Sequence, residues 1–249
     1  MTRLISWFSG GAASAVATKL AIVNNKNIEV VNIEIIEEHP DNKRFLKDCE
    51  EWFGVPIKTI GNDKRNRSIY EVYRKTKYIS GVYGAACTKQ LKKDVRIKYE
   101  KPNDIQVFGF TVEEEHRLNR LIDSNNEVKF ISPLIERGLT KQDCLAIVQD
   151  AGIELPEMYK LGFNNNNCLG CPKGGLGYWL MIKKHFPEMF EKMNNMEKLL
   201  GVKIGKYTKD GEVHRIQLHE IPSHIKMQDD SLDVQCGVFC LITQGEIND

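Results

Sequence analysis

Apolar positions in the first 152 residues fall into two alternating patterns. Short, nearly continuous apolar runs occupy residues 3–9, 28–36, 56–61, 104–110 and 129–136, the last ending in a turn. Between them, apolar residues recur at helical spacing in residues 12–25, 41–54, 68–79, 88–101, 111–124 and 140–152. Continuous apolar strands are typical of a parallel sheet buried on both faces. Their alternation with helices predicts a doubly wound, mostly parallel α/β sheet.

Capping residues support several of these helix boundaries. Asp41 is expected to be the N-cap of the second helix, and Gly54 to end it. Thr140 is the expected cap of residues 140–152. Thr111 and Glu114 have the spacing of a capping box, so Glu114 is interpreted as a helix cap.

The pattern changes after residue 163. Residues 162–177 are rich in turn formers and include four consecutive asparagines, residues 178–201 are helical, residues 211–221 suggest a hairpin strand, and residues 229–249 form a tail. We therefore predict an α/β domain over residues 1–163 and a C-terminal extension over residues 164–249 that packs on the same domain. A chain of 249 residues with 41% apolar residues is long enough to bury such a core.

Charge and cysteine content limit the binding partners and the cellular compartment to be expected. The formal net charge is +1, which gives no global attraction to nucleic acids or membranes, and the basic clusters at 62–78 and 87–101 suit a solvated face or a local phosphate site. No leader is evident, and no apolar run approaches the roughly 20 residues of a membrane helix. Seven cysteines, an odd number, argue against structural disulfides, so we expect a cytoplasmic protein. Cys49 and Cys144 are expected to be core residues.

The sequence Ser9-Gly10-Gly11-Ala12-Ala13-Ser14 lies between the first strand and the first helix. It matches neither the dinucleotide fingerprint nor the Walker loop. Two interpretations fit it: a tight strand-to-helix turn, or a phosphate cradle made of glycine N–H groups and a helix N-terminus.

Four motifs in order resemble the phosphoadenosine phosphosulfate (PAPS) reductase family, within the superfamily of PP-loop adenine-nucleotide alpha-hydrolases. The residue 9–14 loop is similar to the PP-loop. It is followed by Glu-Glu-His-Pro-Asp at 37–41, Cys-Thr-Lys-Gln-Leu-Lys-Lys at 87–93, a strand ending in glycine with an arginine beyond it, and Cys-x-x-Cys at 168–171. The resemblance covers roughly residues 4–190.

The resemblance implies roles for individual residues. Nucleotide contacts are expected from Ser9, Gly10, Gly11, Ser14, Glu38, Lys89 and Gly109. Lys92 and Arg117 are expected to meet phosphate or sulfate oxygens during catalysis. His116 and His219 have no neighbours in the sequence that distinguish them from surface histidines.

Two departures from the family pattern affect the reaction. Relatives that cleave ATP usually carry aspartate where this chain has Ala13, so the loop favours binding of a pre-made nucleotide. Cluster-bearing reductases have a Cys-Cys pair, where this chain has only Cys87. With Cys168 and Cys171 this leaves three thiols, which suit a [4Fe–4S] cluster. Zinc and no metal remain alternatives. The fourth iron would take Cys236 or Cys240, or stay open.

The tail segment Gln235-Cys236-Gly237 is similar to the reductase tail, whose cysteine attacks the sulfate sulfur. The alternative is a turn of small residues that happens to contain two cysteines. The resemblance implies a sulfonucleotide reductase that uses ATP, adenosine phosphosulfate or PAPS as its nucleotide and a thioredoxin-like reductant as its partner. The alternatives are an ATP-dependent sulfurtransferase acting on tRNA or DNA, and a non-catalytic nucleotide sensor. The sequence leaves the oligomeric state open.

Overall fold

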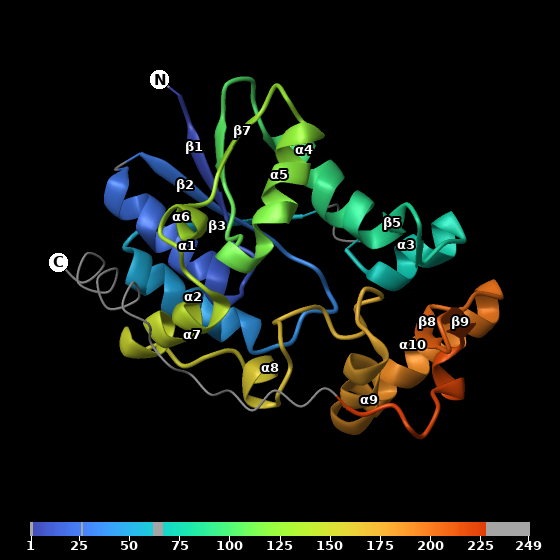
Figure 1. Ribbon diagram of the computed structural model, residues 1–249. Helices are drawn as coiled ribbons and strands as arrows, with labels where there is room; N and C mark the ends of the chain where they lie inside the picture. The colour runs from blue at the N-terminus through green and yellow to red at the C-terminus, as the bar shows by residue number, and fades with distance from the viewer. Residues whose placement is uncertain (1, 26, 62–66, 228–249) are drawn as a thin grey trace.

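A five-stranded sheet forms the centre of the protein. The computed structural model describes residues 2–25, 27–61 and 67–227. The strands are β1 (Leu4–Trp7), β2 (Ile28–Ile33), β3 (Ile57–Ile60), β6 (Ile105–Val107) and β7 (Lys129–Ile131), all parallel in the order β3-β2-β1-β6-β7 (Figure 1). The predicted doubly wound α/β fold is confirmed. The order reverses between β1 and β6, and ligands of such sheets bind beyond the carboxyl ends of the strands at this switch point.

Helices cover both faces of the sheet because consecutive strand residues point to opposite sides. Val30 packs with the apolar side chains of α1 (Ala12–Asn24), α2 (Asn42–Phe53), α6 (Pro133–Glu136) and α7 (Lys141–Asp150). On the other face, Val31 packs with Ile5, Trp7 and Tyr99, the last from α4 (Asp94–Tyr99). Helix α5 (Glu115–Asp123) follows β6 and contacts β7.

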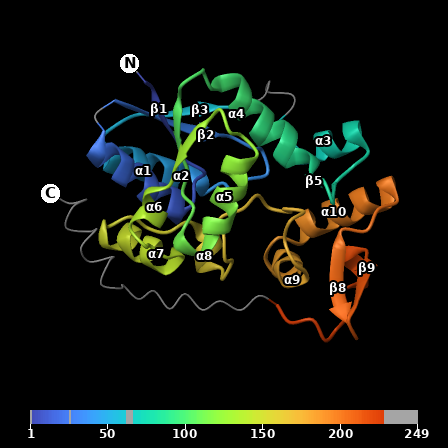
Figure 2. The same ribbon diagram turned by 45° about the horizontal axis from the view of Figure 1, so that its top comes forward.

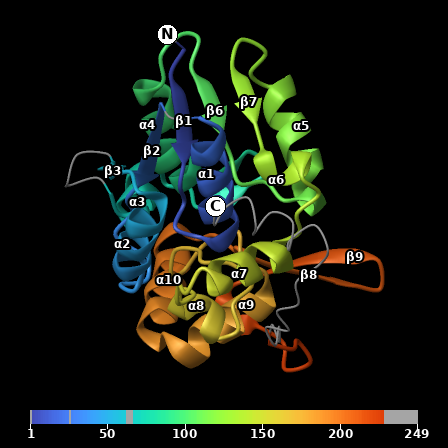
Figure 3. The same ribbon diagram turned by 90° about the vertical axis from the view of Figure 1, so that its left-hand side faces the viewer.

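A second apolar core lies beyond the carboxyl ends of the strands. It joins α3 (Ile69–Thr76), β5 (Gly84–Ala85) and the π-helix η2 (Thr88–Lys93) to α8 (Glu157–Lys160), α9 (Leu176–His185) and α10 (Pro187–Leu200). The short strand β4 (Ser80–Gly81) pairs with β5. Figures 2 and 3 show α9 and α10 at this end of the molecule and the hairpin β8 (Gly205–Lys209) and β9 (Glu212–Ile216) at its edge. The short helix η4 (Leu218–Glu220) follows. No helix in the described ranges is long and apolar enough to span a bilayer.

The structure corrects several predicted element boundaries. The helix predicted over 88–101 begins as a π-helix and becomes α-helical at Asp94, where the N–H bonds to Lys89 O. The helix predicted over 111–124 begins as the 3-10 turn η3 (Val112–Glu114). The helical segment at 178–201 is two helices, because Pro187 starts a new one.

Most of the predicted caps are correct. Gly54 ends α2 with φ +68°, and the Thr140 hydroxyl accepts the Asp143 N–H. Thr111 and Glu114 form the predicted capping box. Asp41 occupies the N-cap position, but its side chain makes no cap hydrogen bond. Its carboxylate binds Arg44 instead, because the guanidinium is a stronger partner than a peptide N–H.

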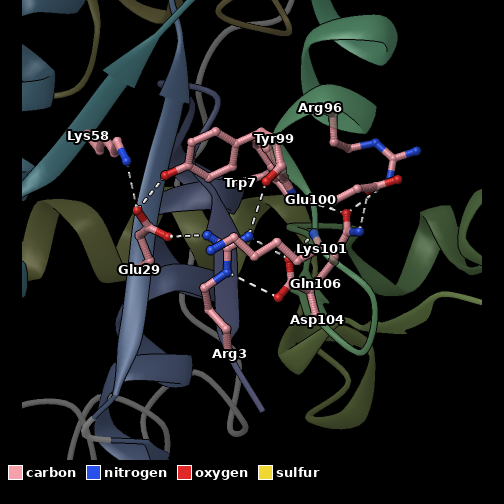
Figure 4. A network of polar contacts seen from close by, with 10 residues as sticks. All are labelled: Arg3, Trp7, Glu29, Lys58, Arg96, Tyr99, Glu100, Lys101, Asp104 and Gln106. Atoms are coloured by element: carbon pink, nitrogen blue, oxygen red, sulfur yellow. Dashed lines mark hydrogen bonds and ion pairs between the residues drawn. The ribbon is translucent and has the colours of Figure 1, made fainter. Parts of the chain in front are cut away.

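A polar network closes the amino ends of the strands (Figure 4). Arg3 lies 2.6 Å from Asp104 and 3.0 Å from Glu29, joining the starts of three strands. The Arg3 hydrogen bond holds the pKa of Asp104 below its ordinary value. Lys58 and Tyr99 also bind Glu29. Each charged group in this network faces an opposite charge or a hydrogen-bond partner.

Candidate functional site

The phosphate loop, residues 9–14, connects β1 to α1. Gly10 has φ +77°, a conformation that L side chains rarely adopt, so the loop requires glycine there. The Ser14 hydroxyl accepts hydrogen bonds from the Ser9 N–H (3.1 Å) and the Ser9 hydroxyl (3.0 Å), and donates to Gly11 O (2.9 Å). Ser14 is only 6% exposed. The buried Ser14 hydroxyl therefore holds the conformation of the loop, while Ser9 is exposed to solvent.

Gly109, predicted from the family pattern, lies against this loop. A Cβ placed on Gly109 would be 2.7 Å from Ser14 Cα and 2.9 Å from the carbonyl carbon of Ala13. Real Cβ atoms do not approach backbone atoms so closely, and backbone cannot yield as a flexible side chain does. The second residue after β6 must therefore lack a side chain for the loop to adopt this shape.

An amide pair, Asn42 and Asn166, joins the phosphate loop to the C-terminal segment. The Asn166 Nδ2 group donates to Gly10 O (2.6 Å) and to Asn42 Oδ1 (2.9 Å). Neither residue was selected from the sequence. The only signals there were the run of four asparagines and the Pro-Asp-Asn sequence after β2. The contact joins segments 124 residues apart, which no local pattern encodes.

Glu38 follows β2 and lies partly buried beside the amide pair. Burial raises the pKa of its carboxyl to about 7, against the opposing effects of Lys92 and Asn42. A carboxyl group with such a pKa carries a proton in part of the molecules at neutral pH, so it is able to donate or accept one.

The cysteine turn, residues 168–171, is fixed to the same region. The Leu169 N–H donates to Glu37 O (2.7 Å), which attaches the turn to the loop after β2. The Tyr178 hydroxyl accepts from the N–H groups of Gly170 and Cys171 and donates to Cys168 O, at 2.9–3.0 Å. The turn is closed by the Cys171 N–H donating to Cys168 O, and its third residue, Gly170, has φ +84°, a conformation that favours glycine.

Cys87 immediately precedes the π-helix η2 and is 8% exposed. The buried Tyr73 hydroxyl donates to its sulfur at 3.3 Å. Tyr73 also interacts electrostatically with Cys171, which indicates that the two cysteine segments are neighbours. Short π-helices are rare and frequently occur at functional sites.

Lys92 faces all three cysteines. Burial lowers the pKa of Lys92, but attraction to the ionised forms of Cys168, Glu38, Cys171 and Cys87 outweighs burial and raises it. Although these neighbours surround it, the lysine keeps access to solvent, so it lines an open part of the site. Burial raises the pKa of Cys168 to about 12, against the effect of Lys92. The Cys168 and Cys171 thiols are therefore neutral unless a further cation joins them.

The structure thus brings together Gly10, Gly11, Ser14 and Gly109 at the loop, and Glu38, Lys92, Cys87, Cys168 and Cys171 next to it. Within residues 2–25, 27–61 and 67–227, no three His, Cys, Asp or Glu side chains converge on a single metal position.

Two predicted contact residues have other partners. The Lys89 side chain is 74% exposed and lies 3.7 Å from Asp94. Arg117 pairs with Glu114 and stacks over the Phe110 ring. Cys236 and Cys240 lie outside the described residues. The nucleotide contacts assigned from the resemblance stay predictions.

Comparison with known proteins identifies the family. The model of the phosphoadenosine phosphosulfate reductase domain matches residues 3–174. The chain belongs to this family. It therefore carries an adenine-nucleotide alpha-hydrolase-like domain of a family that binds adenine nucleotides.

Solved structures show more distant likenesses. The crystal structure of PAPS reductase from Candida auris, a phosphate complex, has a TM-score of 0.47 and 13% identity, and the match covers 65% of this chain and 79% of that chain. The U34-tRNA thiolase NcsA from Methanococcus maripaludis, with its [4Fe-4S] cluster, has a TM-score of 0.44 and 15% identity, over 96% and 80% of the two chains. No curated protein matches. Neither structural likeness decides the reaction.

Proposed function

We propose that this protein is a sulfonucleotide reductase. It binds adenylylated sulfate at the phosphate loop and reduces the sulfate to sulfite by thiol chemistry beside a [4Fe–4S] cluster. The observation that carries the proposal is an uninterrupted series of neighbours from Gly10 through the amide pair and Glu38 to Lys92 and the three thiols. In this proposal, a phosphate on the loop has its attached group on the thiol side.

The residues that would hold the cluster are Cys87, Cys168 and Cys171. Three thiols that interact with one another and with Lys92 fit an iron–sulfur cluster, because its separate irons take separate thiolates. Ligands of a cluster need not converge on one point. When bound, such a cluster supplies a redox-active and electrostatic centre next to the nucleotide.

The chain's own groups perform the transfer in two stages. The Cys236 thiolate attacks the sulfate sulfur, an S–S bond forms, and the S–O bond to the α-phosphate breaks, so the nucleoside phosphate leaves. A thioredoxin-like dithiol then attacks the Cys236 sulfur, which releases sulfite. The second thiol of the reductant resolves the mixed disulfide, so the dithiol is oxidised by two electrons. Lys92 and the loop N–H groups neutralise charge on the sulfonyl and phosphate oxygens.

Sulfite release tests the reaction. Purified protein is incubated without oxygen with a thioredoxin-like dithiol and either adenosine phosphosulfate or PAPS, and sulfite and the nucleoside phosphate are measured. We expect equimolar products with at least one substrate and none with Cys236→Ser. Absence of sulfite from both substrates overturns the proposal.

Iron analysis tests the cluster separately. Anaerobically purified protein should contain about four irons per chain, consistent with a cubane cluster. Cys168→Ser should lower this content, whereas Cys144→Ser, a buried cysteine in α7, should keep it. Zinc in place of iron, or no metal, contradicts the cluster assignment.

A second candidate is an ATP-dependent sulfurtransferase. It is favoured by the segment beyond residue 174, which the family match leaves out and which packs directly behind the cysteine turn through Trp179 and Met193. Ala13 weighs against it, because the loop has no carboxylate to hold a metal for ATP cleavage. Pyrophosphate release from ATP, with or without tRNA, distinguishes this candidate from the reductase.

A further inference from the structure

The amide pair contains polar atoms that the protein itself does not use. Asn42 is 4% exposed, yet its Nδ2 group makes no hydrogen bond of ordinary geometry among the described residues, where its contact is the Glu38 carboxyl, whose pKa it lowers. Asn166 Oδ1 has no donor there. An unpaired buried donor destabilises the folded protein. Such a cost in the wall of a nucleotide site indicates that a ligand supplies the missing acceptor.

The direction of the free donor is fixed by its partner. Asn166 Nδ2 donates to Asn42 Oδ1, so the opposite end of the Asn42 amide, the NH₂ group, is left for a ligand. This group lies beside the phosphate loop, since a Cβ on Gly10 would be 3.7 Å from Asn42 Nδ2. An anion at this position is stabilised by the positive end of the α1 dipole and by a hydrogen bond from the Asn42 NH₂ group.

The donor lies on the cysteine side of the loop. Its neighbours are Glu38, whose ionisation Asn42 favours, and Asn166, two residues before Cys168. We take the α-phosphate to lie on the loop N–H groups with its next group, rather than its ribose, on this side.

We propose that Asn42 is a specificity-determining residue that donates from Nδ2 to the tetrahedral anion attached to the α-phosphate, either a sulfate or a β-phosphate. Asn166 is a positioning residue that orients the Asn42 amide. The inference rests on the proposed function only in placing an adenine nucleotide on the loop.

Binding of AMP, ADP and adenosine phosphosulfate measures this contact directly. Titrations use the full chain with Cys236→Ala, so that the phosphosulfate is not consumed. The readout is the affinity for ADP or phosphosulfate relative to AMP. In Asn42→Ala and Asn42→Asp this ratio should fall about tenfold or more, because a hydrogen bond to a charged group is lost. Asn166→Asp should lower it less.

Asn42→Asp should fold as the wild type does, because a carboxylate in the first turn of α2 suits the helix dipole and keeps the acceptor for Asn166. Urea unfolding curves verify this. The matched control is Asn165→Asp, an exposed residue in the same run of asparagines, which should leave the ratio unchanged.

Each outcome decides the inference. If the affinity relative to AMP falls for both ADP and adenosine phosphosulfate, the Asn42 contact is to a tetrahedral anion in general. If it falls for adenosine phosphosulfate alone, the contact is to sulfate. The inference is overturned if this affinity ratio does not change in the variants, or if AMP loses as much affinity as the other two ligands. It is also overturned if the wild-type chain binds AMP, ADP and adenosine phosphosulfate equally. If the ratio falls but no sulfite is ever released, the inference stands and the proposed reaction fails.

Discussion

The two ends of the central sheet treat their polar groups in opposite ways. At the amino ends, Arg3, Glu29 and Asp104 form a closed set of ion pairs across three strands. At the carboxyl ends, Asn42 and Asn166 carry unpaired buried atoms, and Glu38 has a pKa raised to about 7. The polar side chains at the start of these strands therefore have their ion-pair and hydrogen-bond partners, whereas some of those at the carboxyl ends do not.

This difference separates stability from binding. A paired carboxylate such as Asp104 stabilises the folded state, whereas a desolvated one such as Glu38 destabilises it whenever it must ionise. Unpaired and strained groups persist where a ligand or a reaction compensates for them. Substitutions at the two ends should consequently change the free energy of unfolding in opposite directions and with different pH dependence. They should also differ in their effect on nucleotide binding.

Gly109→Val should have the largest effect. The new Cβ meets the backbone of Ser14 and Ala13, so the phosphate loop must move, and we expect about 3 kcal/mol of lost stability together with loss of nucleotide affinity. Urea unfolding and AMP titration measure the two effects. Gly175→Ala is the control, because a Cβ there meets nothing within 4 Å. Normal AMP binding by Gly109→Val would show that the loop does not depend on this close approach.

Glu38→Gln should stabilise the apoprotein at high pH. The carboxyl loses its proton near pH 4.5 when unfolded but at about 7 when folded, so wild-type stability falls as the pH rises between these values. Glutamine removes this loss, and the variant should gain about 2 kcal/mol over wild type at pH 8 but little at pH 4. Urea midpoints across this range test it, and a pH-independent difference would contradict the assignment.

Arg3→Ala should act in the opposite pH range. The pKa of Asp104 lies below its ordinary 3.8 because of Arg3, so the stability from this pair is present above that value and disappears as the pH falls through the depressed pKa. Because Arg3 is partly exposed, we expect a loss of about 1–2 kcal/mol at pH 7. Acid titrations of both proteins measure it. AMP affinity should not change, and a change would mean that the two ends are coupled.

Tyr178→Phe should have the smallest effect. It removes one hydroxyl that serves three backbone groups of the cysteine turn, and the turn is open to water on one side. We expect about 1 kcal/mol of lost stability and faster alkylation of Cys168 and Cys171, measured residue by residue by mass spectrometry. The alkylation rate of Cys87, whose hydroxyl partner is Tyr73, serves as the internal control.

Local patterns predicted the sheet, its helices and most caps, since these depend on side-chain periodicity and on near neighbours. The capping box at Thr111 and the left-handed Gly54 are of this kind. The π-helix at Thr88, whose Leu91 packs in the second core, is not predicted, because the same apolar spacing fits an α-helix. Pro187 divides the segment that the apolar spacing predicts as one helical stretch, since it starts a new helix.

The residues of the candidate site also fall into those that local sequence patterns predict and those that only the structure shows. The glycines of the phosphate loop, the cysteine turn and Lys92 were found in the sequence, because conformational demands and thiol spacing are local properties. The roles of Asn42, Asn166, Tyr73 and Tyr178 were not, because each acts on a segment distant in the chain or through a backbone group. Contacts such as Asn166 with Gly10 exist only once the second core has placed the C-terminal segment beyond the strand ends.

The sequence by itself determined an α/β sheet with a glycine loop after its first strand, and it predicts that three thiols act together. Only the tertiary structure decided that Glu38, Lys92 and those thiols share one environment, and that the amide pair leaves a donor free beside the loop. The physical reason is that periodicity and turn chemistry act over a few residues. Desolvation and unpaired hydrogen bonds, in contrast, depend on every segment that packs around a group.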